Sequence, residues 1–217
     1  MIDPIAQSQI DDLKLTRGRP LLAVDADEVL VYFLRHFRDY ADQIGWTLNL
    51  TTKRLDSALI KRATGRVAAR DEAWAMLETF FRVETLSQQP IAAAAEVLER
   101  LSADAQIVVL TNIPHFARED RIRNLGAFGH NWPVITNSGG KGRALDLLYR
   151  KAAARTVFVD DSATQLDSAA KHAPDVGRVQ LIGCDWARPY LPRSSDVQAC
   201  IGGWREAETA LRKGLEI

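Results

Sequence analysis

Short apolar runs, each followed by turn residues and then by a helical pattern, constrain the fold of this chain more than any other feature of its sequence. Five such runs occupy residues 21–24, 107–110, 134–135, 157–159 and 179–182. Each is short enough to be a buried strand, and helical patterns over residues 118–125, 141–153 and 164–173 lie between them. This alternation predicts an α/β fold built on a parallel sheet, with helices covering its faces.

The stretch from residue 31 to residue 89 interrupts the alternation. Amphipathic patterns over residues 33–44, 53–63 and 70–81 predict helices, and no convincing buried strand lies among them. Pro90 marks the return, with an alanine-rich helix expected over residues 91–101. We therefore expect a helical domain at residues 31–89, inserted into a core made of residues 1–30 and 90–217. Residues 5–15 fit either a short helix packed on that core or a loose arm.

Charge and composition exclude several functional classes. Lys plus Arg and Asp plus Glu number 28 each, so no overall field favours nucleic acid or an anionic membrane. The N-terminus lacks the features of a secretory signal, and no apolar run approaches the roughly 20 residues of a membrane helix. We expect a cytoplasmic protein. Cys184 and Cys200 lie far apart without other candidate ligands nearby, which predicts neither a zinc site nor a disulfide.

Two carboxylates follow the first predicted strand. Asp25 and Asp27 stand two residues apart, where an extended backbone points alternate side chains the same way, so they can share a site. In open parallel sheets, ligands bind beyond the carboxyl ends of the strands. The alternative is a helix cap beside a solvated acid, because caps favour Asp.

Polar residues also follow the second predicted strand and precede a later helix. Thr111 and Asn112 could hold phosphate oxygens at a strand-to-helix turn, although such residues are more often simple caps. Lys141 follows Gly139 and Gly140, which permit close backbone approach. Its ammonium could neutralise crowded carboxylates and a phosphate, whereas a lone Lys is usually solvated.

Adjacent acids follow the fourth predicted strand. Asp160 and Asp161 come directly after three apolar residues, and two unpaired carboxylates there would repel one another. A cation is the economical explanation, and hard oxygen ligands point to Mg2+. One of the two acids could instead cap the following helix.

The order of these elements resembles the haloacid dehalogenase (HAD) superfamily, over residues 21 to 173. The resemblance implies a Rossmann-like core in which the first strand is central, and a small helical cap over the site. It also implies that Asp25 attacks phosphorus and forms an aspartyl-phosphate, while Asp27 acts as acid and base. Thr111, Asn112 and Lys141 would then bind the phosphoryl oxygens. The Mg2+ ligands would be Asp25, the backbone carbonyl of Asp27, and Asp161 or Asp160, with a slight preference for Asp161.

This resemblance implies a phosphatase that acts on a small phosphorylated metabolite, such as a nucleotide or a sugar phosphate. An acid at position 27 favours phosphate esters over halides, because a halide leaves without a proton. A phosphotransferase with the same intermediate and a catalytically silent HAD-fold regulator are the alternatives. Receiver domains carry similar residues in a different order. The oligomeric state stays open.

One residue departs from the family pattern, and one set of residues in the inserted stretch has two interpretations. Glu28 stands where the family commonly has Gly, which affects the local turn. The inserted stretch carries Trp46 and Trp74 and a set of basic residues, Arg54, Lys61, Arg62, Arg66 and Arg70. These residues fit either a basic, aromatic lip around an organic phosphate or an ordinary amphipathic helix pair with solvated basic faces.

Overall fold

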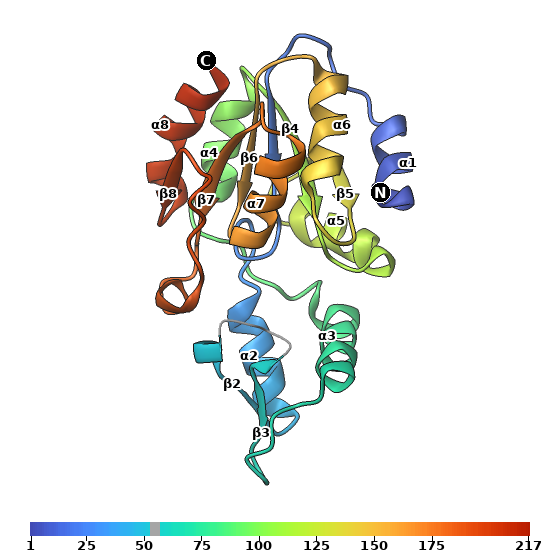
Figure 1. Cartoon of the computed structure of the whole chain (residues 1–217), viewed down its shortest axis with the longest axis vertical. Helices are drawn as coiled ribbons and strands as arrows, with labels where there is room; N and C mark the ends of the chain where they lie inside the picture. The colour runs from blue at the N-terminus through green and yellow to red at the C-terminus, as the bar shows by residue number, and fades with distance from the viewer. Residues whose placement is uncertain (53–56) are drawn as a thin grey trace.

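The computed structural model describes residues 1–52 and 57–217, and its centre is a six-stranded sheet (Figure 1). The strand order is β5-β4-β1-β6-β7-β8, and every neighbouring pair is parallel. The strands are β1 (Leu21–Val24), β4 (Gln106–Thr111), β5 (Val134–Thr136), β6 (Thr156–Asp160), β7 (Gly177–Leu181) and β8 (Ala199–Ile201). The predicted α/β fold with a Rossmann-like parallel sheet is confirmed, and so is the central place of the first strand.

Helices cover both faces of this sheet because the strand residues alternate between two cores. Leu22 and Val24 of β1 face one core, which includes side chains of α4 (Ala94–Ser102) and α8 (Trp204–Leu215). Leu21 and Ala23 face the other, which includes side chains of α1 (Pro4–Asp12), α6 (Gly142–Ala152) and α7 (Ala163–His172). Helix α5 (Arg118–Gly126) adds Leu125 to the first core. All four residues of β1 are therefore buried, as expected of a central parallel strand.

The N-terminal segment is a packed helix rather than a loose arm. Ala6 and Ile10 of α1 are fully buried against the core, and α1 contacts α6 and β5. Outside the insertion, the sequence pattern also did not predict the edge strand β8 and the helix α8. Among the described residues, no helix is long and apolar enough to span a membrane.

The inserted stretch lies at one end of the sheet, and its buried apolar residues form one cluster with Ile113, Ala117, Cys184 and Ala187 from outside the insertion (Figure 1). Its described elements are α2 (Leu34–Gln43), β2 (Trp46–Leu48), a 3-10 turn (Leu50–Thr52), β3 (Leu59–Lys61) and α3 (Arg70–Glu84). Phe33, Phe37, Phe80 and Phe81 pack ring against ring at its centre, with centroids 5.3–5.7 Å apart. The two long helices match the prediction.

One expectation for the inserted stretch is wrong. Strands β2 and β3 pair antiparallel, Trp46 with Lys61 and Leu48 with Leu59, and β3 lies where the pattern over residues 53–63 predicted a helix. Trp46 and Leu48 alternate with Thr47, and the two apolar side chains are buried while the threonine is exposed. The period is therefore that of a half-buried strand, which three residues are too few to reveal in sequence. Residues 53–56 lie outside the described part.

Candidate active site

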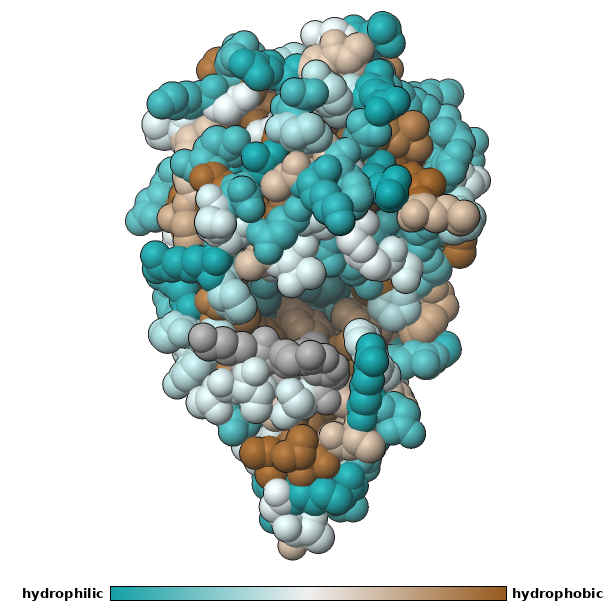
Figure 2. Space-filling model, viewed as in Figure 1, coloured by the Kyte–Doolittle hydropathy of each residue, from teal (hydrophilic) through white to brown (hydrophobic). Residues whose placement is uncertain are grey.

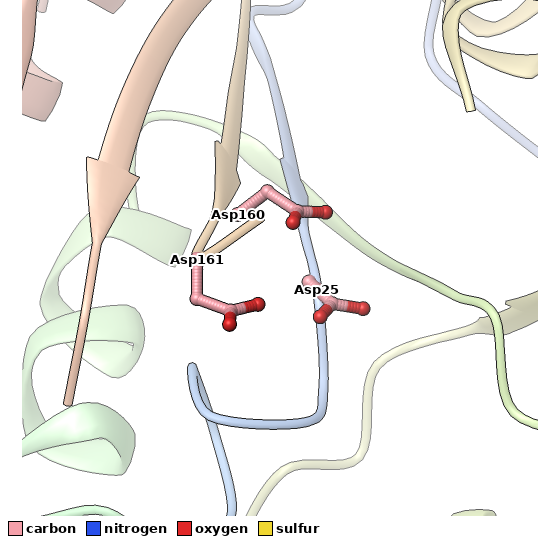
Figure 3. Close-up of side chains that lie close together, drawn as sticks. All are labelled: Asp25, Asp160 and Asp161. Atoms are coloured by element: carbon pink, nitrogen blue, oxygen red, sulfur yellow. The ribbon is translucent and has the colours of Figure 1, made fainter. Parts of the chain in front are cut away.

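The carboxylates that follow β1 and β6 meet at the carboxyl edge of the sheet. Asp25 is the residue after β1, and its backbone N–H donates to the carbonyl of Val159 in β6 at 2.9 Å. Asp160 is the last residue of β6, and Asp161 follows it. Because β1 and β6 are neighbouring parallel strands, their ends bring the three side chains to one place, where the carboxylates face a common space (Figure 3).

Lys141 reaches into this cluster from the start of α6. Its Nζ donates to Asp25 Oδ1 and to Asp160 Oδ2, each at 2.6 Å, and the residue is almost fully buried. Gly142 makes this depth possible, since a Cβ at that position would collide with the backbone of Ser168 in α7. The ammonium therefore stands between the two carboxylates as a buried ion pair with each.

The charges of the cluster do not balance. Burial raises the pKa of Asp25 to about 7, although the Lys141 ammonium pulls it down, and the Asp160 carboxylate adds to the rise. Burial also raises the pKa of Asp160, and it raises that of Asp161 well above its usual range, with Asp160 and Asp25 adding to the effect. Burial lowers the pKa of Lys141, but the Asp160 and Asp25 carboxylates outweigh it and hold that pKa above its ordinary value. One cation faces three acids, so ionising all three leaves excess negative charge.

The donor set of this cluster fits a hard divalent cation. Asp25, Asp160 and Asp161 each offer a carboxylate oxygen, and these oxygens all lie within 4.8 Å of one another. Lys141 Nζ occupies one oxygen of Asp160, and the backbone N–H of Ser162 donates to the other at 2.8 Å. The Asp161 carboxylate accepts no hydrogen bond from the described residues. Asp161 is thus the acid of the Asp160–Asp161 pair with both oxygens available, the choice favoured from the sequence.

Asp27 is held by a buried arginine that the sequence did not single out. Arg121 Nη2 of α5 donates to Asp27 Oδ1 at 2.6 Å and to Gln88 Oε1 at 2.8 Å. Gln88 Nε2 donates to the same Asp27 oxygen at 3.3 Å, and Asn124 Oδ1 accepts from Arg121 Nη1. Arg121 and Gln88 are fully buried. Asp27 Oδ1 is therefore fixed by two donors, while Oδ2 bonds to none of the described residues.

Glu28 adopts a backbone conformation that favours glycine. Its φ is +62°, in the left-handed region, and its carboxylate turns back to accept from the backbone N–H groups of Phe33 and Leu34 at 2.8 and 2.6 Å. These N–H groups open α2, so Glu28 caps the first helix of the inserted stretch. Its second oxygen is buried without a partner among the described residues, and burial raises the pKa of Glu28 to about 7. The Glu28 carboxylate therefore links the turn after β1 to the first helix of the insertion.

Thr111, the last residue of β4, and Asn112, which follows it, differ in exposure and in contacts. Thr111 is fully buried, and its hydroxyl accepts from the backbone N–H of Ile113 at 3.3 Å. Asn112 is exposed and lines the cavity, where its amide donates to the Gly139 carbonyl at 2.7 Å. Asn137 donates to Asn112 Oδ1 at 2.9 Å, so the loop before Lys141 is fastened to the end of β4.

A cavity of about 430 Å³ opens above the carboxylates, between the sheet edge and the inserted stretch. Figure 2 shows the molecule hollowed at this level, with apolar surface inside the hollow. Its polar end is formed by Asp25, Asp27, Glu28, Asn112, Lys141, Asp160, Asp161, Ser162 and Gln165. The insertion contributes Phe33, Leu34, Leu50, Trp74, Leu77 and Phe81, and a later loop adds Tyr190 and Leu191.

Most of the basic residues of the insertion are engaged elsewhere. Arg66 pairs with Glu72 at 2.8 Å and lies over the ring of Trp46, which is buried. Arg62 donates to the backbone carbonyl of Asp42. Lys61, Arg62, Arg66 and Arg70 do not line the cavity, and Arg54 lies outside the described residues. Of the set named from the sequence, Trp74 is the described residue that faces the cavity.

Solved structures with a similar fold identify this architecture. A haloacid dehalogenase-like family hydrolase from Streptococcus pneumoniae superposes with a TM-score of 0.62 at 14% identity, over 89% of this chain and 98% of that one. A HAD family hydrolase from Deinococcus radiodurans, with bound phosphate and sodium, gives 0.61 at 17% identity, over 92% and 97%. The chain has the HAD fold. A third structure with this fold, of a Bacillus subtilis protein assigned as a HAD-hydrolase and bound to magnesium, gives 0.58 at 15% identity over 93% and 100%.

Comparison of structures identifies the HAD fold of this chain, whereas comparison of whole sequences does not. No protein-family model matches the chain, and no curated protein matches it. The fold that the order of Asp25, Thr111, Lys141 and Asp160-Asp161 implied is nevertheless present, with its inserted helices.

Proposed function

We propose that this protein is a magnesium-dependent phosphatase of the HAD superfamily, which hydrolyses a small organic phosphate monoester through an aspartyl-phosphate on Asp25. The observation that carries the proposal is the buried cluster of three carboxylates and Lys141 at the carboxyl edge of the sheet. A magnesium-bound and a phosphate-bound structure among the similar folds support it.

Asp25 is the nucleophile in this proposal. One oxygen of its carboxylate is held by Lys141, which leaves the other to attack phosphorus. The new bond joins Asp25 to phosphorus while the bond from phosphorus to the alcohol oxygen breaks. Water then attacks the aspartyl-phosphate, which releases inorganic phosphate and restores the carboxylate.

Asp27 moves the proton in both steps. It gives a proton to the leaving alcohol oxygen and, as a carboxylate, takes one from the attacking water. Since Arg121 and Gln88 donate hydrogen bonds to Asp27 Oδ1, Asp27 Oδ2 is the oxygen that gives and takes the proton. Arg121 is therefore a positioning residue for Asp27.

Lys141 and a metal ion would neutralise the negative charge of the phosphoryl group and the carboxylates. The phosphoryl oxygens would be bound by the side chains of Lys141, Thr111 and Asn112, together with the backbone N–H groups beside Thr111 and Asn112. Asp25, Asp161 or Asp160, and the backbone carbonyl of Asp27 would hold Mg2+, which offsets negative charge during phosphoryl transfer when it is bound. We further propose that residues 31–89 act as a cap on a core of residues 1–30 and 90–217.

The test is release of inorganic phosphate from a panel of phosphate monoesters, with Mg2+ and with EDTA. Asp25→Asn should abolish turnover, and Asp27→Asn should slow the cleavage of esters with poor leaving groups by about 100-fold or more. The exposed Asp39→Asn is the matched control and should behave as the wild type. Metal-independent turnover, or activity retained in Asp25→Asn, would contradict the proposal. Loss of the ester without phosphate release, when an acceptor alcohol is present, would favour the phosphotransferase.

A further inference from the structure

The wall of the cavity that faces away from the carboxylates is apolar. On α3, Trp74, Leu77 and Phe81 follow one another at the i, i+3, i+7 spacing of a single helix face. All three line the cavity, together with Leu50 from the turn that precedes β3. This face stands where the alcohol part of an ester would lie once its phosphoryl group meets Asp25.

The aromatic side chains of this wall differ in exposure to solvent. Phe81 is 6% exposed and stacks on Phe33 with ring centroids 5.7 Å apart, so the aromatic core holds it in place. Trp74 is 52% exposed, a large indole surface left in contact with water at the cavity. An apolar partner seated there would remove that surface from water, and a flat ring suits an indole face.

The polar groups of the cavity are gathered at the other end and are mostly acidic. The five acids are Asp25, Asp27, Glu28, Asp160 and Asp161. Among the described residues, two buried cations pair with them: Lys141 with Asp25 and Asp160, and Arg121 with Asp27. A second phosphate or a carboxylate on the substrate would meet this excess of negative charge. The hydroxyl groups of a sugar would lie against Trp74 and Leu77, which offer them little hydrogen bonding.

We infer that the substrate is a phosphate monoester of a hydrophobic alcohol that carries an aromatic ring, with the ring packed on Trp74 and Leu77. The inference rests on the proposed phosphatase activity. It narrows the earlier expectation of a small phosphorylated metabolite, and it disfavours the two examples given there, a nucleotide and a sugar phosphate.

The test compares primary-alcohol esters, whose leaving groups are chemically similar. Benzyl and 2-naphthylmethyl phosphate are measured against glycerol 3-phosphate and glucose 6-phosphate with Mg2+. The arylmethyl esters should have a kcat/KM about ten-fold higher or more, with naphthylmethyl above benzyl, since each ring buries more apolar area. Equal rates, or a preference for the sugar ester, would overturn the substrate class.

Variants of α3 separate binding from general effects on the fold. Trp74→Ala should lower the ratio of kcat/KM for naphthylmethyl over glycerol phosphate by about ten-fold, mainly through KM. Val83→Ala removes an equally exposed apolar side chain of the same helix, 59% exposed and outside the cavity lining, and should leave that ratio unchanged. An unchanged ratio in Trp74→Ala would contradict the role of the indole.

Acetyl phosphate distinguishes the two proposals. Its small acyl group does not test the apolar wall, so its Mg2+-dependent hydrolysis reports the chemistry at Asp25 alone. Hydrolysis of acetyl phosphate without a preference for arylmethyl esters would overturn the substrate class and leave the phosphatase standing. Failure to turn over acetyl phosphate and every ester would overturn both.

Discussion

Replacing Asp161 by Asn should make the metal-free protein more stable. The carboxylate oxygens of Asp25, Asp160 and Asp161 lie within 4.8 Å of one another, and Lys141 bonds to Asp25 and Asp160 but not to Asp161. Two unit charges at that separation repel by roughly 3 kcal/mol at an effective dielectric constant of about 20. Because the other charges partly screen this repulsion, we expect Asp161→Asn to gain roughly 1–3 kcal/mol in the free energy of unfolding in EDTA.

The gain should depend on pH in a defined direction. The pKa of Asp161 is raised well above its ordinary value in the folded protein, so the folded state resists ionisation that the unfolded chain undergoes near 3.8. The wild type therefore loses stability at this site as pH rises from about 4 towards the raised pKa. The advantage of Asp161→Asn should be larger at about pH 8 than at about pH 5.

Magnesium should remove or reverse the stability advantage of Asp161→Asn. A cation held by these carboxylates stabilises the wild type by about 2.7 kcal/mol at a hundred-fold excess over its Kd, and the variant by much less. Urea unfolding of both proteins with EDTA and with Mg2+ measures this, and Asp185→Asn, whose side chain is 88% exposed, is the control. A variant less stable than the wild type in EDTA, or equally stabilised by Mg2+, would refute the reasoning.

Two further predictions concern buried groups that can carry charge. Arg121→Met leaves Asp27 and Gln88 without their buried donor and should cost about 3–5 kcal/mol in urea unfolding, whereas Arg123→Met, 67% exposed on the same helix, should cost less than about 0.5 kcal/mol. His130 is buried, and burial lowers its pKa to about 4 from 6.5, so the folded state resists a proton that the unfolded chain accepts. The wild type should lose up to about 3 kcal/mol as pH falls between these values, and unfolding of His130→Leu should show a flatter pH dependence. An unchanged pH slope would contradict this account of His130.

The sequence predicted those parts of the fold and the site that have a local pattern. Asp25 and Asp160 follow apolar runs, so their place at strand ends could be predicted, and the sheet then brings them together. Arg121 lies in a helix rich in charged residues, which is typical of a solvated face. Its burial depends on the packing of α5 against Gln88, which no local pattern encodes. Strand β8 has three partly exposed residues and therefore no strong apolar period.

The path of the chain through the sheet also has a consequence for how the protein folds. The central strand β1 is synthesised before the other strands of the sheet, yet Leu22 pairs with Ile107 and Val157, which lie far along the chain. By contrast, α2, β2, β3 and α3 pack together within one continuous stretch. Local contacts form before distant ones, because closing long loops costs entropy. We expect the insertion to become compact before β1 has paired with its two neighbours, β4 and β6. A chain truncated before β6 would leave one edge of β1 unpaired and should therefore aggregate.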